Sequence, residues 1–138
     1  MGYPGMPTIY YGDEAGQYGS ADPDCRRTYP WGKEDKDLIA YYKKVIGVRN
    51  AHKDIFARGD VKTLKAEGDI YAFSRTADSG KSGVVALNRG KAQQVVLPVT
   101  FADGTVFTDE LTGTKVTVSG GKLTLNLGEN QGMMLVEG

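Results

Sequence analysis

The sequence predicts a mainly β fold, an antiparallel Greek-key-type β-sandwich preceded by a single βα unit. After residue 58, short stretches of alternating apolar and polar residues follow one another between glycine-containing turns, which is typical of an antiparallel sandwich. Before residue 58, one short apolar run, one long polar segment and one helical pattern each occur once. This change of pattern predicts two regions, residues 1–57 and residues 58–138.

The first region is predicted to contain a strand, a loop and a helix. The run PTIYY at residues 7–11 is short and apolar, as expected of a strand buried on both faces. Residues 12–34 are rich in glycine and polar groups and predict a long loop, of a kind that is usually functional. Residues 36–52 follow a helical spacing, with Asp35 or Asp37 available as the N-cap. The apolar stripe of this helix consists of Leu38, Tyr42, Val45 and Ile46.

Eight strands are predicted in the second region. They cover residues 61–66, 69–76, 83–88, 93–98, 106–110, 115–118, 122–127 and 132–136. The turns between them contain glycine, which takes the positive φ that tight turns need. In KLTLNL at residues 122–127, Leu123, Leu125 and Leu127 fall on one face and are predicted to point into the core. Met134 and Val136 of the last strand are expected to point inward as well.

Charge and composition narrow the classes of partner. The chain has 17 basic and 17 acidic residues without a long run of either sign, so neither nucleic acid nor a membrane surface is expected as a partner. No stretch approaches the roughly 20 apolar residues of a membrane span. Cys25 is the only cysteine, which excludes a disulfide within the chain. The compartment, cytoplasmic or secreted, stays open.

Several polar and aromatic side chains of the predicted loop are candidates for a site. Asp22 is placed to form an ion pair with Arg26 or Arg27 in a loop of this kind. Trp31 and Tyr29 carry aromatic rings that can stack on a flat ligand, although aromatic residues more often serve packing.

The acidic residues of the loop suggest two further sites. Asp13 and Glu14 are adjacent, but consecutive strand residues point to opposite faces and do not form an acid/base pair. A calcium site from Asp13, Glu14, Asp22 and Asp24 suits the oxygen ligands that calcium prefers, yet the spacing matches no known loop motif. A catalytic role is expected for neither His52 nor Cys25.

Three stretches carry a resemblance to a known enzyme family: GMPTIYYGDEAG at residues 5–16, DPDCRR at residues 22–27, and Trp31. They resemble the end of the catalytic barrel in the α-amylase family of glycoside hydrolases, especially its neopullulanase, maltogenic amylase and cyclomaltodextrinase members. The segment VRNAHKD is similar to the family's last barrel helix, and the β-rich region is similar to its C-terminal sandwich domain. The resemblance spans the whole chain, and its first 31 residues are the most specific part.

The resemblance implies that residues 1–57 are the last strand, loop and helix of a (β/α)8 barrel, which takes about 250 residues when complete. The family's three catalytic carboxylates lie on earlier barrel strands, so no catalytic residue is expected in this chain. Asp22 and Arg26 match the DPxxR positions that hydrogen-bond a glucose unit in close relatives. Together with Trp31 they are the expected substrate-binding residues. No metal or cofactor is expected, although calcium is possible in a full-length parent.

Three hypotheses for function follow. The first is a C-terminal fragment of a retaining hydrolase of α-1,4-glucans (starch, maltooligosaccharides or cyclodextrins), inactive alone because it lacks the nucleophile and the acid/base. The second is a non-catalytic carbohydrate-binding or accessory module. The third is an unusual minimal amylase that uses Asp13, Glu14, Asp22 or Asp24. Because the strand at residues 7–11 would lack parallel neighbours, self-association through residues 1–57 is also expected.

Overall fold

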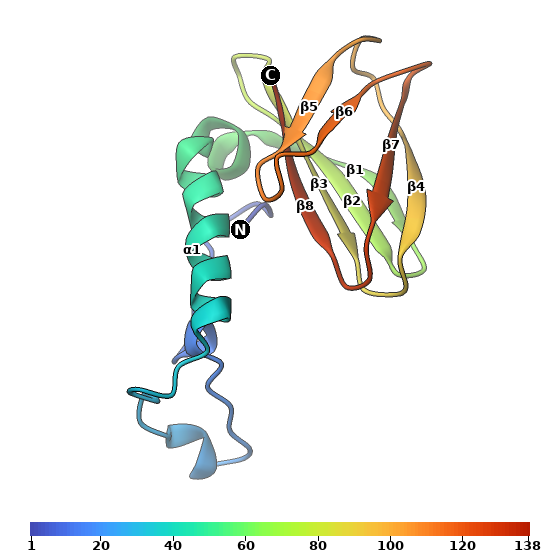
Figure 1. The fold of residues 1–138 in the computed structure, drawn as a ribbon. Helices are drawn as coiled ribbons and strands as arrows, with labels where there is room; N and C mark the ends of the chain where they lie inside the picture. Colours follow the sequence, from blue (N-terminus) through green and yellow to red (C-terminus); the bar gives the residue numbers. More distant parts are fainter.

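The computed structural model describes all of residues 1–138 and confirms the mainly β, antiparallel fold class (Figure 1). Its eight strands are β1 (Asp60–Glu67), β2 (Ile70–Thr76), β3 (Ser82–Asn88), β4 (Gln93–Pro98), β5 (Val106–Asp109), β6 (Lys115–Thr117), β7 (Lys122–Leu127) and β8 (Gly132–Glu137). One sheet has six strands in the order β1-β2-β3-β8-β5-β6, and β4 pairs with β7 in a second sheet. Every strand predicted after residue 58 is present, and every strand pair is antiparallel.

The sandwich core lies between the two sheets. The alternation in β7 is confirmed, since Leu123, Leu125 and Leu127 are all buried while the residues between them are exposed. They pack with residues from the facing sheet, among them Val84, Phe107 and Leu135. Apolar area removed from water is the main source of stability in such a core, so the period-two pattern of β7 fixes which of its faces turns inward.

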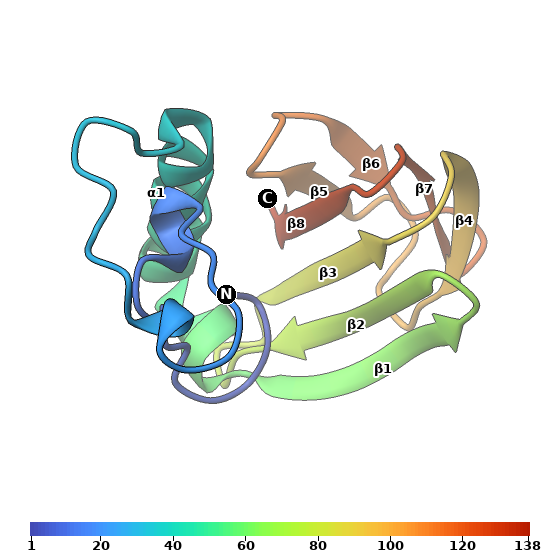
Figure 2. The same cartoon turned by 90° about the horizontal axis from the view of Figure 1, so that it is seen from below.

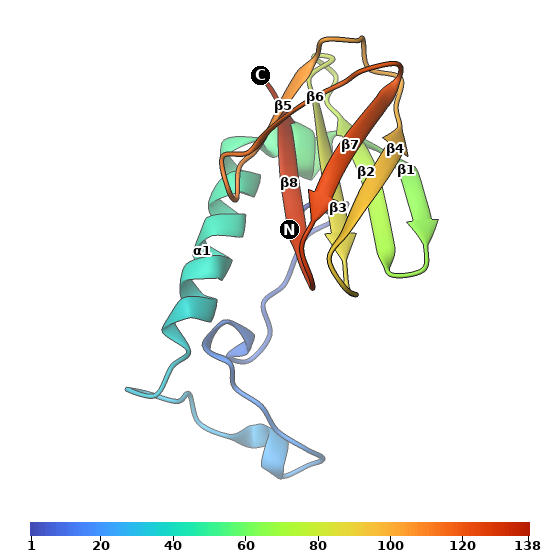
Figure 3. The ribbon, with the colours of Figure 1, turned by 45° about the vertical axis from the view of Figure 1, so that its right-hand side comes forward.

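A second core covers the opposite face of the six-stranded sheet. Helix α1 (Lys36–Ala51) and the π-helical turn η3 (Asp54–Arg58) lie on the side of this sheet away from β4 and β7 (Figure 3). The second core contains Val45, Val48, Ile55, Phe56, Phe73, Ala77, Val85, Met134 and Val136. The prediction that Met134 and Val136 face the sandwich interior is therefore wrong. Strand β8 is covered on both faces, and Met133 and Leu135 are its residues in the sandwich core.

Helix α1 begins where the sequence predicts. The Asp35 side chain accepts a hydrogen bond from the backbone N–H of Leu38 at 2.9 Å, which satisfies one of the free donors at the helix start. The helix ends at Ala51, and residues 54–58 continue as one π-helical turn before β1. No helix of the structure combines the length and the apolar character that crossing a membrane requires.

The strand predicted at residues 7–11 is not formed. These residues are exposed and belong to no helix or sheet. A parallel strand needs hydrogen-bonding neighbours along its edges, and this chain supplies none. The predicted loop at residues 12–34 is confirmed, with only two short 3₁₀ turns, η1 (Asp13–Ala15) and η2 (Asp24–Arg26). In Figure 1 this blue segment extends away from the sandwich beyond the start of α1.

Two buried arginines hold the N-terminal end, which lies between α1 and the six-stranded sheet (Figure 2). Arg49 on α1 donates to the carbonyl oxygens of Gly5 and Phe56, both at 2.7 Å, and also to those of Met1 and Tyr3. Arg75 on β2 donates to Gly2 at 3.0 Å and twice to Gly59. Burial, together with the nearby Arg49, lowers the pKa of Arg75 from its usual value. The start of the chain is thus held by side chains instead of by strand pairing.

Candidate functional site

The loop between η1 and α1 leaves the body of the molecule and returns to nearly the same point. Gly12 and Gly16 flank η1 with φ of 90° and 73°, values that L-residues with a side chain rarely adopt. The N–H of Asp35, the cap of α1, donates to the carbonyl oxygen of Ala15 at 3.1 Å. Within the loop, the Gln17 side chain donates to the carbonyl oxygen of Arg27 at 2.7 Å. The excursion that carries the predicted site residues is therefore closed at its base and linked across its middle.

Asp22 and Arg26 form a two-point ion pair in this loop. Arg26 Nε lies 2.7 Å from Asp22 Oδ1, and Arg26 Nη2 lies 2.9 Å from Asp22 Oδ2. The two side chains remain 59% and 73% exposed, respectively. The ion pair expected from the residues alone is formed, and an exposed pair of this kind adds little to stability. The same geometry holds a carboxylate and a guanidinium side by side with donor and acceptor capacity facing solvent.

The other possible partner of Asp22, Arg27, is engaged elsewhere. Arg27 Nη2 lies 2.6 Å from Asp24 Oδ1, and its guanidinium stacks 4.4 Å from the centre of the Tyr18 ring. The Arg27 hydrogen bond and the N–H of Ser20 lower the pKa of Asp24 from its usual value. Asp24 and Arg27 therefore brace the loop, and Asp22 and Arg26 are its outward-facing pair.

Exposed aromatic rings are concentrated in the same part of the chain. Trp31 is 81% exposed and lies against Tyr29, with ring centres 4.6 Å apart and planes inclined by 54°. Burial raises the pKa of Tyr29, and the charges of Glu14 and Glu34 add to the rise. Tyr29 thus serves as packing for Trp31, while the indole keeps most of its surface free for a flat ligand.

The acidic residues do not assemble into a second site. Asp13 Oδ2 accepts from the N–H of Tyr10 at 3.3 Å, which is a local turn contact. No group of three or more His, Cys, Asp or Glu side chains is placed to hold a metal ion, so Asp13, Glu14, Asp22 and Asp24 form no calcium cluster. His52 Nε2 lies 4.0 Å from Glu110 Oε2 beyond the end of α1, and Cys25 is exposed in the loop.

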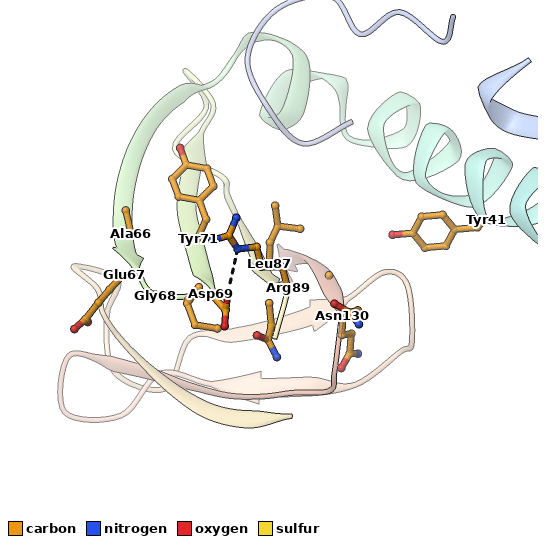
Figure 4. Close-up of a pocket in the computed structure, with 13 residues that line it drawn as sticks. Tyr41, Ala66, Glu67, Gly68, Asp69, Tyr71, Leu87, Arg89 and Asn130 are labelled. Carbon is orange, nitrogen blue, oxygen red and sulfur yellow. Dashed lines mark hydrogen bonds and ion pairs between the residues drawn. The ribbon is translucent and has the colours of Figure 1, made fainter. Parts of the chain in front are cut away.

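The structure also contains a groove that the sequence analysis missed (Figure 4). It has a volume of about 660 Å³ and runs between α1 and the turns at one end of the six-stranded sheet. Seven of the 13 residues that line it are Tyr41, Asp69, Tyr71, Leu87, Arg89, Asn130 and Gly132. They come from α1, from β2, β3 and β8, and from three turns, so no single stretch of sequence signals the groove. The sequence signals only that Asp69, Arg89 and Asn130 each lie in a turn between strands.

No protein-family profile matches the chain. It is 47% identical over 148 residues to an amylopullulanase of Thermoanaerobacter thermohydrosulfuricus, covering 99% of this chain, and 41% identical over 142 residues to neopullulanase 2 of Thermoactinomyces vulgaris, covering all of it. A solved cyclomaltodextrinase structure superposes with a TM-score of 0.81 at 32% identity, over 94% of this chain and 23% of that one. The chain is homologous to a segment of α-amylase family glycoside hydrolases.

This family assignment covers all of the described residues, from the loop to the last strand. The chain spans 10% of the length of the amylopullulanase and 24% of the length of the neopullulanase. The α-amylase family resemblance predicted from the loop motifs is confirmed. What a whole α-amylase family enzyme does is a separate question, because most of the length of these relatives has no counterpart here.

Proposed function

We propose that this chain is the sugar-contacting C-terminal segment of a retaining hydrolase of α-1,4-glucans, and that it contributes Asp22, Arg26 and Trp31 to the substrate site. The observation that carries the proposal is the two-point pair of Asp22 and Arg26, held outward by a braced loop. Neighbouring hydroxyls of a glucose unit donate and accept hydrogen bonds, so they match a carboxylate beside a guanidinium. The exposed Trp31 indole offers a flat apolar surface to a sugar ring.

The same segment is proposed to be inactive alone. A retaining mechanism needs two carboxyl groups about 5 to 5.5 Å apart, one of them kept protonated by a raised pKa. In the loop, Asp22 and Asp24 each pair with an arginine, and the pKa of Asp24 is lowered. A lowered pKa favours the ionised form of Asp24, the opposite of what a general acid requires. This counts against a minimal amylase built on these carboxylates.

A binding experiment tests the sugar contact directly. Titration of the chain with maltotriose, followed by amide chemical shifts, should show changes at residues 17–31 that weaken strongly in Arg26→Ala. Arg58→Ala is the matched control, since Arg58 is an exposed arginine on η3 that forms no ion pair. Equal affinities of the two variants for maltotriose would mean that Asp22 and Arg26 form only an ion pair within the loop and do not bind sugar.

A non-catalytic binding module is the second candidate function. The groove beside α1 favours it, because the groove is open and carries both aromatic and polar side chains. Self-association through residues 1–57 also remains a proposal. It is supported by the exposed segment at residues 6–11, whereas part of the α1 stripe, including Val45, is covered by the chain's own sheet.

A further inference from the structure

The groove beside α1 has an apolar floor made by three neighbouring strands. Tyr71 on β2 is directly opposite Leu87 on β3, and Leu87 is directly opposite Gly132 on β8. The neighbours Ala72, Ala86 and Met133 point into the sandwich core, so this row lies on the outer face of the sheet. Gly132 has no side chain, and a Cβ there would crowd the Leu87 side chain, at 3.0 Å from its Cδ2. The result is a shallow floor on which a flat molecule can rest.

Polar groups surround this floor. Asp69 and Arg89 form an ion pair at 3.0 Å between two turns, and both side chains are largely exposed. Tyr41 reaches from α1 across the groove toward the sheet (Figure 4). Asn130 has a φ of 50°, and its backbone N–H donates to the carbonyl oxygen of Gly90. The Asn130 amide and the Tyr41 hydroxyl form no hydrogen bond within the chain, so both are free to serve a ligand.

The chemistry of the groove selects the class of ligand. The charges of Asp69 and Arg89 cancel each other, and Glu67, which also lines the groove, is paired with Lys65 at 2.7 Å. This balance of charge favours a neutral molecule over an anion or a cation. The tyrosine rings and Leu87 favour an apolar face, whereas the amide and the hydroxyl favour a ligand rich in hydrogen-bonding groups. A volume of about 660 Å³ is within the usual range of small-molecule sites. A pyranose has both properties, since its ring carbons form flat apolar faces and its hydroxyls lie around the edge.

We infer that this groove is a second carbohydrate-binding site, separate from the loop of Asp22 and Arg26, which takes a neutral glucan. It shares no residue with residues 12–34, and it faces the helix and the sheet turns instead. That the ligand is an α-glucan rests on the proposed function. Such a site would hold a polymeric substrate at a distance from the loop and raise its local concentration there.

The test uses the whole chain, labelled with ¹⁵N and titrated with maltotriose. We expect shift changes at the amides of residues 68–69 and 131–132. Asn130→Gly is the decisive variant, because glycine accepts the positive φ at residue 130 without strain while the side-chain amide of asparagine is removed. It should weaken binding by about threefold to tenfold, the effect of losing one hydrogen bond. Tyr41→Phe tests the hydroxyl in the same way, on an exposed helix position.

Controls separate this site from the first. Arg26→Ala should leave the changes at residues 68–69 and 131–132 intact, and changes confined to residues 17–31 would overturn the second site while supporting the first. Changes in the groove alone would support the second site and count against sugar contact by Asp22 and Arg26.

A second trisaccharide tests the class of ligand. Cellotriose, a β-linked trisaccharide, should bind the groove more weakly. If it binds there as well as maltotriose, the α-glucan assignment is wrong. The absence of any change in the groove at saturating maltotriose would overturn the inference.

Discussion

The Arg75 guanidinium on β2 donates a hydrogen bond at 3.0 Å to the carbonyl oxygen of Gly2, 73 residues earlier in the chain. Arg75 is only 1% exposed and contacts no carboxylate, so backbone carbonyls solvate its charge. Gly2 lies so close to the sheet that a Cβ there would be 2.5 Å from Val85 Cγ2. This contact joins the segment before the loop to the sandwich, which makes the two predicted regions one packed unit in this chain.

The first prediction concerns this link. Arg75→Met should lower the free energy of unfolding, because it leaves the carbonyls of Gly2 and Gly59 without partners at a cost of about 1–3 kcal/mol each. Denaturant titration of the variant and of the unmodified chain would measure this loss. Arg58→Met is the control, as Arg58 is an exposed arginine on η3. Equal stability of the two variants would show that the carbonyl contacts of Arg75 contribute nothing.

The second prediction concerns the sandwich core. Leu125 is 1% exposed and lies opposite Val95 in the β4–β7 pair. Leu125→Ala should therefore destabilise the chain by about 2–5 kcal/mol. Thr124→Ala, on the exposed face of the same strand, is the comparison. Denaturant unfolding of both variants measures the difference, and a loss below about 0.5 kcal/mol for Leu125→Ala would mean that the register of β7 is reversed.

How much the sequence predicts depends on whether a feature is local. The strands of the sandwich were predictable because alternation and glycine turns are written within a few residues of each other. In GMMLV at the start of β8 all four apolar residues are buried, so alternation is absent and the faces of Met134 and Val136 could not be read. The run PTIYY has the composition of a buried strand, but composition cannot show whether partner strands are present.

For the candidate site as well, local features were predictable from the sequence and non-local ones were not. The ion pair of Asp22 and Arg26 was predictable because it spans four residues within one motif. Which arginine pairs with Asp22 was not predictable, since Arg27 is only one residue farther along the chain and instead pairs with Asp24 and stacks on Tyr18. The groove depends on Tyr41 and on turns that are brought together only by the fold. Features of this last kind require the three-dimensional arrangement.

The third prediction concerns activity. The purified chain should release no reducing sugar from maltotriose or soluble starch above the rate of buffer, because Asp22 and Asp24 are paired with arginines and Asp13 is held in a turn. A reducing-sugar assay over several hours measures this. Sustained release that followed the protein through purification, and that fell in Asp22→Ala or Glu14→Ala, would establish the minimal amylase instead.

The fourth prediction concerns assembly. Residues 6–11 are exposed, include Met6 at 91% and Tyr10 at 72%, and form no strand pairs. Exposed apolar side chains on an unpaired segment favour association, so we expect the weight-average mass in light scattering to rise with concentration.

Deleting residues 1–57 is a poor test, because it would also uncover Phe73, Met134 and Val136. The double substitution Met6→Ser with Ile9→Ser leaves that core intact and should reduce the mass toward that of the monomer. Val96→Ser, on the exposed face of β4, should leave the mass unchanged. A constant monomer mass for the unmodified chain, or an equal effect of the two variants, would rule out association through this segment.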